Sequence, residues 1–270
     1  MPKRLSEDQQ RNYHRDGLAF PVDALSPAEV GHYRAYYDEL ETRLGGRPRT
    51  VEVRQMHLHF PWAYQLATHP AVLDSAEDLI GPDLLVWATE LFVKHARDEA
   101  VAVGWHRDRP YFGLTGGEVV TAWVTLSESA AANGCMRALP RSAERDRPPP
   151  PTPRGAKEPL PPPGTEAHLV DVVLRPGQLS LHGPDVAHGS GPNRSGEKRV
   201  GFVIRFVTPD ARPAHGRPAA LLARGADRFG HFGRAEPPGP ADEEQALAGM
   251  RESAGQHLEA ILENLKHAGR

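Results

Sequence analysis

One nine-residue segment, Arg199 to Val207, constrains the fold more than any other part of the sequence. Positions 200, 202, 204 and 206 are apolar, whereas the positions between them carry Arg199, Gly201, Val203 and Arg205. This period of two predicts a β-strand with one apolar face and one face that bears two arginines. Further strands, rich in β-branched, aromatic and leucine residues, are predicted over 84–95, 119–126, 169–174 and 178–182. Short strands separated by Gly/Pro turns favour a sandwich or a barrel.

The N-terminal third is predicted to be helical instead. Ser6 and Ser26 each stand three residues before Gln or Glu, the capping-box pattern that begins a helix. Helices are predicted over 6–17, 26–45, 70–80 and 242–265. Because no internal repeat and no second domain is evident, we expect one domain over 1–270. Its N-terminal helices would occupy about 5–80 and its β core about 84–210.

A proline-dense segment interrupts the β core. Nine of the 27 prolines fall between Pro148 and Pro163, so the stretch 147–164 cannot be a central strand or a helix interior. Two interpretations stay open for this segment: a solvated, semi-rigid loop, or a lid over a functional site.

The overall composition excludes several classes of function. With 35 acidic and 32 basic residues, the chain lacks the positive surplus that binds nucleic acids or anionic membranes. The single cysteine, Cys135, excludes an intrachain disulfide and a cysteine-rich zinc site. No apolar run is long enough to cross a membrane, and Met1 to Gln10 is polar, unlike a secretion signal. We therefore expect a cytoplasmic protein that acts on neither nucleic acids nor membranes.

The strongest candidate for chemistry is the pair His106 and Asp108. On an extended segment, both side chains would point to the same side and share a metal ion. A third ligand would complete a facial triad of two histidines and one carboxylate, which suits Fe(II). Either His182 or His188 can supply it. Arg199 follows on the next predicted strand and could hold a carboxylate in bidentate fashion, or form a surface ion pair.

The sequence resembles the phytanoyl-CoA dioxygenase family of Fe(II)/2-oxoglutarate oxygenases. The resemblance extends over most of the chain and is carried by these motifs: HFPW (59–62), HPAVLDSAEDLIGPDLLVW (69–87), LFVK (91–94), WHRDRPYFGL (105–114), VTAW (120–123), NGCMRALP (133–140), VVLRPGQLSLH (172–182), HGSGPNRS (188–195) and RVGFVIRF (199–206). It implies a double-stranded β-helix, also called a jelly roll, with helices packed outside one sheet.

The resemblance also implies roles for individual residues. Among the alternatives above, it selects His188 as the third ligand beside His106 and Asp108. It makes Arg199 the partner of the far carboxylate of 2-oxoglutarate. The other residues that it places beside this cosubstrate are Ser190 and Thr89, as hydrogen-bonding groups, and Phe112, as a packing neighbour.

The implied reaction is the oxidative decarboxylation of 2-oxoglutarate by molecular oxygen, coupled to hydroxylation of a small molecule. Two alternatives are a jelly-roll metal enzyme without 2-oxoglutarate, such as a hydrolase or isomerase, and a non-catalytic ligand-binding jelly roll. The residues 140–143 read Pro-Arg-Ser-Ala where relatives have Pro-Gly-Ser-His, so the entrance to the site departs from the family pattern. The sequence does not identify the substrate.

Overall fold

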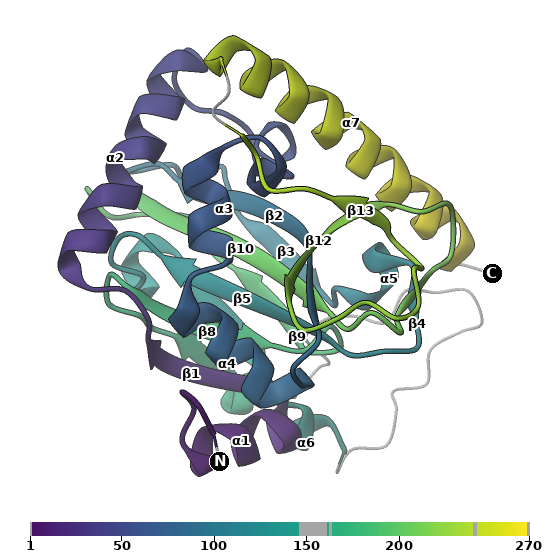
Figure 1. The fold of residues 1–270 in the computed structure, drawn as a ribbon. Helices are drawn as coiled ribbons and strands as arrows, with labels where there is room; N and C mark the ends of the chain where they lie inside the picture. Colours follow the sequence, from purple (N-terminus) through teal and green to yellow (C-terminus); the bar gives the residue numbers. More distant parts are fainter. Residues whose placement is uncertain (1, 146–160, 162–163, 240–241, 269–270) are drawn as a thin grey trace.

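Two β-sheets form the centre of the computed structural model, which describes residues 2–145, 161, 164–239 and 242–268 (Figure 1). The larger sheet has seven strands in the order β1-β8-β5-β10-β2-β12-β13, and the smaller has four in the order β3-β9-β6-β7. A separate short pair joins Leu114–Thr115 (β4) and Arg212–Pro213 (β11). The strands of the two sheets are Leu18–Asp23 (β1), Leu84–Lys94 (β2), Val103–His106 (β3), Val119–Thr125 (β5), Met136–Leu139 (β6), Val170–Val172 (β7), Gln178–His182 (β8), Ala187–Ser190 (β9), Arg199–Val207 (β10), Ala219–Arg224 (β12) and Gly233–Ala235 (β13). The predicted double-stranded β-helix is confirmed.

The predicted strands agree with the observed ones except near 169–174. There, β7 covers only Val170–Val172, the part that pairs with β6. Most of the proline-dense segment 147–164 lies outside the described residues, so its role as a loop or a lid stays a prediction.

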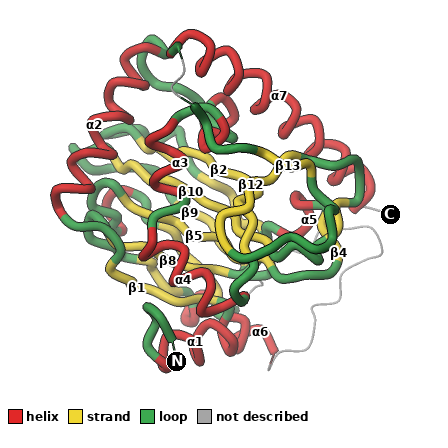
Figure 2. Tube along the Cα trace, viewed as in Figure 1, coloured by secondary structure: helices red, strands yellow, loops and turns green. Residues whose placement is uncertain are grey.

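Helices cover the outer face of the larger sheet, as Figures 1 and 2 show for α2, α3 and α4. Both predicted capping boxes are present: Ser6 begins α1 and Ser26 begins α2. The helices are Glu7–Asp16 (α1), Pro27–Arg43 (α2), Pro61–Ala67 (α3), Pro70–Ile80 (α4), Arg109–Phe112 (α5), Arg141–Arg145 (α6) and Glu243–Ala268 (α7), with 3-10 turns at Thr50–Glu52 (η1), Met56–Leu58 (η2), Ala131–Asn133 (η3) and Glu166–His168 (η4).

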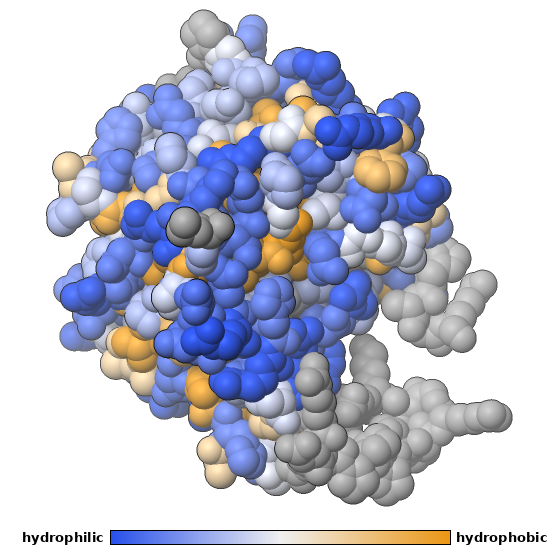
Figure 3. Space-filling model, turned by 60° about the horizontal axis from the view of Figure 1, so that its bottom comes forward, coloured by the Kyte–Doolittle hydropathy of each residue, from blue (hydrophilic) through white to orange (hydrophobic). Residues whose placement is uncertain are grey.

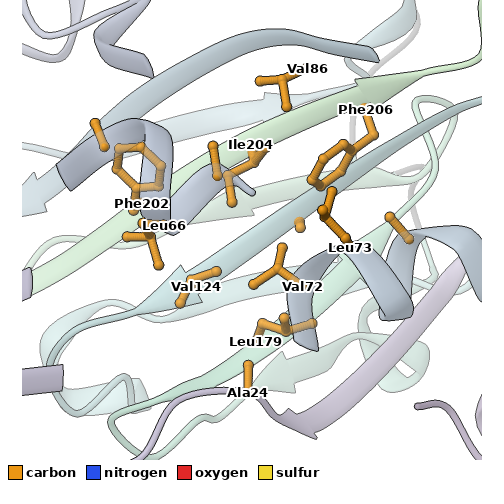
Figure 4. Close-up of a cluster of buried hydrophobic side chains, with 14 of the residues drawn as sticks. Ala24, Leu66, Val72, Leu73, Val86, Val124, Leu179, Phe202, Ile204 and Phe206 are labelled. Carbon is orange, nitrogen blue, oxygen red and sulfur yellow. The ribbon is translucent and has the colours of Figure 1, made fainter. Parts of the chain in front are cut away.

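The main hydrophobic core lies between these helices and the larger sheet. Phe202, Ile204 and Phe206 point from β10 toward Leu66 of α3 and Val72 of α4 (Figure 4). All five side chains are fully buried. Burial of one such side chain stabilises the fold by about 1.5–3 kcal/mol. The apolar face predicted for residues 200–206 is therefore the face under the helices, and the arginine face points between the two sheets.

The C-terminal helix α7 joins this core at one end and the region of α5 at the other. Met250 is completely buried in the core. Further along, the Asn264 amide donates to the carbonyl of Tyr111, 3.1 Å away. The apolar side chains of this helix are only partly covered, because Leu262 is 51% exposed. No helix in the described ranges is long and apolar enough to span a bilayer. The face in Figure 3 is mainly hydrophilic, with small apolar patches.

Candidate metal centre

His106 and Asp108 meet at the end of β3, although not on one extended strand as predicted. The strand ends at His106, and Asp108 has helical backbone angles (φ −74°, ψ −32°) at the start of α5. The turn nevertheless brings the two side chains together, with Nε2 of His106 3.5 Å from Oδ1 of Asp108. A turn, instead of the alternation of a strand, therefore places both groups on one side.

His188 approaches this pair from the neighbouring strand. Strands β3 and β9 are antiparallel, and His106 lies directly opposite His188 in their register. The ring centroids of the two histidines are 4.3 Å apart. One ligand atom from each of His106, Asp108 and His188 lies within 4.8 Å of the other two. A set of two imidazoles and one carboxylate is the donor set of a facial triad for Fe(II).

Backbone carbonyls fix which nitrogen of each ring faces the centre. Nδ1 of His106 donates to the carbonyl of Gly104 at 2.8 Å, and Nδ1 of His188 donates to that of Val186 at 2.9 Å. Because Nδ1 carries the proton, Nε2 keeps its lone pair, as in metal sites where backbone groups orient the ligand.

His182 is close to the triad but is arranged differently. Its Nε2 lies 3.7 Å from Oδ2 of Asp108, the carboxylate oxygen that does not face His106. Its Nδ1 is buried and has no hydrogen-bond partner among the described residues. This geometry suits a side chain that holds the Asp108 carboxylate better than it suits a third ligand.

The protonation states of His188 and Asp108 favour metal binding. Burial lowers the pKa of His188 to about 3, and the nearby His182 acts in the same direction. Burial alone would raise the pKa of Asp108. His106, His182 and the positive charge of Arg205 outweigh this effect and hold that pKa well below its usual value. A neutral imidazole and an ionised carboxylate are the forms that bind a metal cation.

A cavity of about 60 Å³ extends from the triad between the two sheets and has Arg199 and Ser190 in its wall. Arg199 is only 3% exposed, and its guanidinium lies over the Trp123 ring, 5.2 Å from the ring centroid. Gly201 makes room for this indole, because a Cβ at that position would lie 2.1 Å from Cζ2 of Trp123. Burial lowers the pKa of Arg199 to about 10, so the guanidinium remains charged at neutral pH.

The sequence model of the phytanoyl-CoA dioxygenase (PhyH) family matches residues 13–201. The chain belongs to this family. A curated relative, the "Probable alpha-ketoglutarate-dependent hypophosphite dioxygenase" of Stutzerimonas stutzeri, is 25% identical over 179 residues, which span 61% of this chain and 59% of that protein. The dioxygenase lolE1 of Epichloe uncinata is 26% identical over 185 residues, 68% of each chain.

Solved structures agree with this membership. The apo structure of the non-heme monooxygenase ThoJ has a TM-score of 0.80 and 34% identity, with 96% of this chain and all of that chain covered. A structure of CytC3 with Fe(II) and alpha-ketoglutarate has a TM-score of 0.65 at 20% identity, with 88% and 96% covered, and shows the same fold. The prediction of Fe(II) and 2-oxoglutarate as the cofactors is confirmed at the level of the PhyH family, and the triad provides the donor set for the metal.

Two of the residues predicted to contact the cosubstrate, Thr89 and Phe112, do not line the 60 Å³ cavity of this PhyH protein. Thr89 faces the helices, because it pairs with Ile204 and its hydroxyl lies 3.0 Å from Nδ1 of His57. Phe112 packs at 5.1 Å from Trp87, between ring centroids, and does not line the 60 Å³ cavity. A shift of one residue along a strand exchanges its two faces, so family resemblance alone places such contacts poorly. We therefore place neither residue beside the cosubstrate.

One residue of the region has no role predicted from the sequence. Lys94, at the end of the LFVK motif, is 2% exposed, and its ammonium group donates to Ser190 Oγ at 2.6 Å. Burial lowers the pKa of Lys94 to about 7, and the positive charge of Arg199 acts in the same direction. The sequence signal was a lysine at the end of a mostly apolar strand.

A second charged network lies next to the triad. Glu90 is completely buried and pairs with Arg54 and Arg205, each at 3.2 Å. Arg205 also borders the metal cavity, where its charge lowers the pKa of Asp108. His257 of α7 approaches Glu90 at 3.9 Å. The network therefore connects the C-terminal helix to the wall of the metal site.

Proposed function

We propose that this protein is an Fe(II)- and 2-oxoglutarate-dependent oxygenase that hydroxylates a small organic molecule. In this proposal His106, Asp108 and His188 bind the iron, and Arg199 binds the far carboxylate of 2-oxoglutarate. One observation carries it: the three ligand atoms lie within 4.8 Å of one another, and the cavity they border also holds a buried arginine that has no carboxylate partner among the described residues.

The chain's own residues would act by binding and orienting. Two neutral imidazoles and one carboxylate leave three positions of an octahedral metal for 2-oxoglutarate and oxygen. The bound iron would supply the oxidative decarboxylation of 2-oxoglutarate to succinate and CO2 and the transfer of oxygen to the substrate. Arg199 would orient the cosubstrate, while Trp123 and Val203 in the cavity wall would exclude water.

A larger cavity, of about 320 Å³, is the proposed place for the body of the substrate. Its wall combines Trp87, Tyr111 and Phe112 with the inner side of α7. The Tyr111 ring stands edge-on to the His106 ring, 5.7 Å between centroids, so the Tyr111 ring lies between this cavity and the triad. A mostly apolar hollow with a few polar groups is typical of a site for a small organic ligand.

The test is a substrate screen with reconstituted protein, Fe(II) and 2-oxoglutarate, read by succinate formation. The panel would contain amino acids, acyl-CoA thioesters, phosphonates and aromatic natural products, and His188→Ala would serve as the inactive control. The expected product gains one oxygen atom from isotopically labelled oxygen gas. A product that has lost hydrogen or changed configuration without gaining oxygen would overturn hydroxylation, and an absence of 2-oxoglutarate turnover with every compound would overturn the oxygenase proposal.

A further inference from the structure

Two buried cations share the inner end of the metal cavity. Lys94 of β2 and Arg199 of β10 lie directly opposite each other in the antiparallel register, and both are almost completely buried. Like charges that face each other across two strands destabilise a sheet, and a buried charge without a counter-ion is costly. Neither cation forms an ion pair with a carboxylate of the described residues. The arrangement is therefore suited to an anion that is not part of the described chain.

The hydrogen bonds of Lys94 use all of its donors. The ammonium donates to Ser190 Oγ at 2.6 Å, to the carbonyl of Gly134 at 3.3 Å and to the carbonyl of Gly191. An ammonium group has three donors and no acceptor, so Lys94 has no proton left for the cavity. Apart from its charge, Lys94 can therefore act on a bound ligand only through the groups that it holds.

Ser190 is the group through which this effect reaches the cavity. It lines the cavity wall, and its oxygen accepts a hydrogen bond from the ammonium group of Lys94. The serine's own O–H is therefore free to donate toward the cavity, since a hydroxyl has one donor in addition to its acceptor sites.

The carbonyl of Gly134 holds the two cations in place together. It accepts from Lys94 and from Nη1 of Arg199. Gly134 has a φ of +72°, and a Cβ there would lie 2.4 Å from the carbonyl oxygen of Gly191, so glycine is required for this approach. Nε of Arg199 is buried and has no partner among the described residues, which leaves a donor for a ligand.

We propose that Lys94 is a positioning residue for the cosubstrate. It would turn the Ser190 hydroxyl into a donor toward the carboxylate that Arg199 binds, and would select 2-oxo acids that carry a second carboxylate at this end. This inference rests on the proposed function, because it assumes that 2-oxoglutarate occupies the cavity. The selectivity follows from charge: two buried cations favour a carboxylate there and disfavour a methyl group.

The test compares two 2-oxo acids in the anaerobic Fe(II) protein, with binding read from the metal-to-ligand charge-transfer absorption. Lys94→Met should weaken 2-oxoglutarate binding about tenfold or more. It should leave the binding of 2-oxobutyrate, which lacks the second carboxylate, within about twofold. Because Lys94 would act through Ser190, the double variant Lys94→Met/Ser190→Ala should bind 2-oxoglutarate no more weakly than Lys94→Met alone, whereas independent effects would multiply.

The control is Lys198→Met, which removes a neighbouring lysine that pairs with Glu41 outside the cavity. If Lys94→Met does not fold, Lys94→Gln, which keeps an N–H donor without the charge, should show the same selectivity with a smaller loss. Unchanged 2-oxoglutarate affinity, or an equal loss for both 2-oxo acids, would overturn the proposal. A wild-type protein that shows no charge-transfer absorption with 2-oxoglutarate would instead contradict the proposed function.

Discussion

His182 and His188 belong to the same stretch of chain, yet only one of them has the contacts of a metal ligand. His188 has its Nδ1 occupied by a backbone carbonyl and its ring beside that of His106. Among the described residues, Nδ1 of His182 has no hydrogen-bond partner. Its Nε2 lies near Oδ2 of Asp108, the carboxylate oxygen that does not face His106. For single residues, the role of each histidine therefore depends on which ring nitrogen forms a hydrogen bond and on the group that accepts it.

We expect His188→Ala to lose the bound metal and His182→Ala to retain more of it. Removing His188 deletes a ligand, whereas removing His182 deletes a neighbour that supports Asp108, a change that typically costs about 10–100-fold in metal affinity. Metal analysis after reconstitution with Fe(II) would measure the difference, with the exposed His32→Ala as a control. The opposite order would show that His182 is the third ligand.

Arg199→Ala should weaken 2-oxoglutarate binding because it leaves a carboxylate in a buried site without its partner. The expected loss is about 2–5 kcal/mol in binding free energy. Anaerobic titration of the Fe(II) protein would measure it, and the exposed Arg194→Ala provides a control from the preceding loop. An affinity equal to that of the wild type would mean that another group binds the far carboxylate.

At the scale of elements, the clearest sequence signals are those that begin helices. The side chain of Glu29 bonds the backbone N–H and the hydroxyl of Ser26 at the start of α2. It also lies 3.1 Å from Nε2 of His69, the residue that begins α4. These hydrogen bonds lower the pKa of Glu29 to about 2, and the bonds with Ser26 have the largest effect. One capping box therefore also connects two helices.

This cap predicts a pH-dependent contribution to stability. Because the folded pKa of Glu29 lies below its usual value of 4.5, the contribution is present above pH 4.5 and is lost as the pH falls toward 2. Glu29→Gln should lower the free energy of unfolding by about 1 kcal/mol or less at neutral pH, since the carboxylate is partly exposed.

Urea unfolding of the two proteins at several pH values would test this prediction. The difference between wild type and Glu29→Gln should shrink as the pH falls from 4.5 toward 2. Glu39→Gln, on the same helix but outside the cap, is the control. A difference that stays constant over this range would contradict the assignment.

For the whole molecule, the decisive feature is that one sheet serves two purposes. Its outer face builds the core with α3 and α4, and its inner face, with the smaller sheet, encloses the metal cavity. Helix α7 contributes to both: Met250 enters the core, and His257 reaches the network of Glu90. The C-terminal helix is therefore part of the structure that supports the site.

Met250→Ala should lower the free energy of unfolding by about 2–5 kcal/mol, because it leaves a cavity in a packed core. Leu262→Ala, on the same helix but about half exposed, should change stability by about 0.5 kcal/mol or less. Chemical denaturation of the two variants would measure both values. Equal effects would show that α7 does not pack as described.

The features that depend on near neighbours along the chain could be predicted without the structure. These are the two faces of residues 199–207, the helix starts at Ser6 and Ser26, and the pairing of His106 with Asp108. The first two arise from a repeat or a spacing of a few residues, which backbone geometry converts directly into structure. The third was predicted as a pair, although a turn forms it instead of a strand. The family resemblance added the choice of His188, and the hydrogen bonds of its ring support that choice.

Which distant groups meet depends on how the whole chain folds. Lys94 and Arg199 are brought together by the register of β2 and β10, two strands that are far apart in the chain, and the same register turns Thr89 toward the helices. Asp108 reaches the centre through a turn instead of a strand. The physical reason is that strand register and loop closure between remote segments depend on packing of the whole domain, and a shift of one residue would exchange the two faces of a strand.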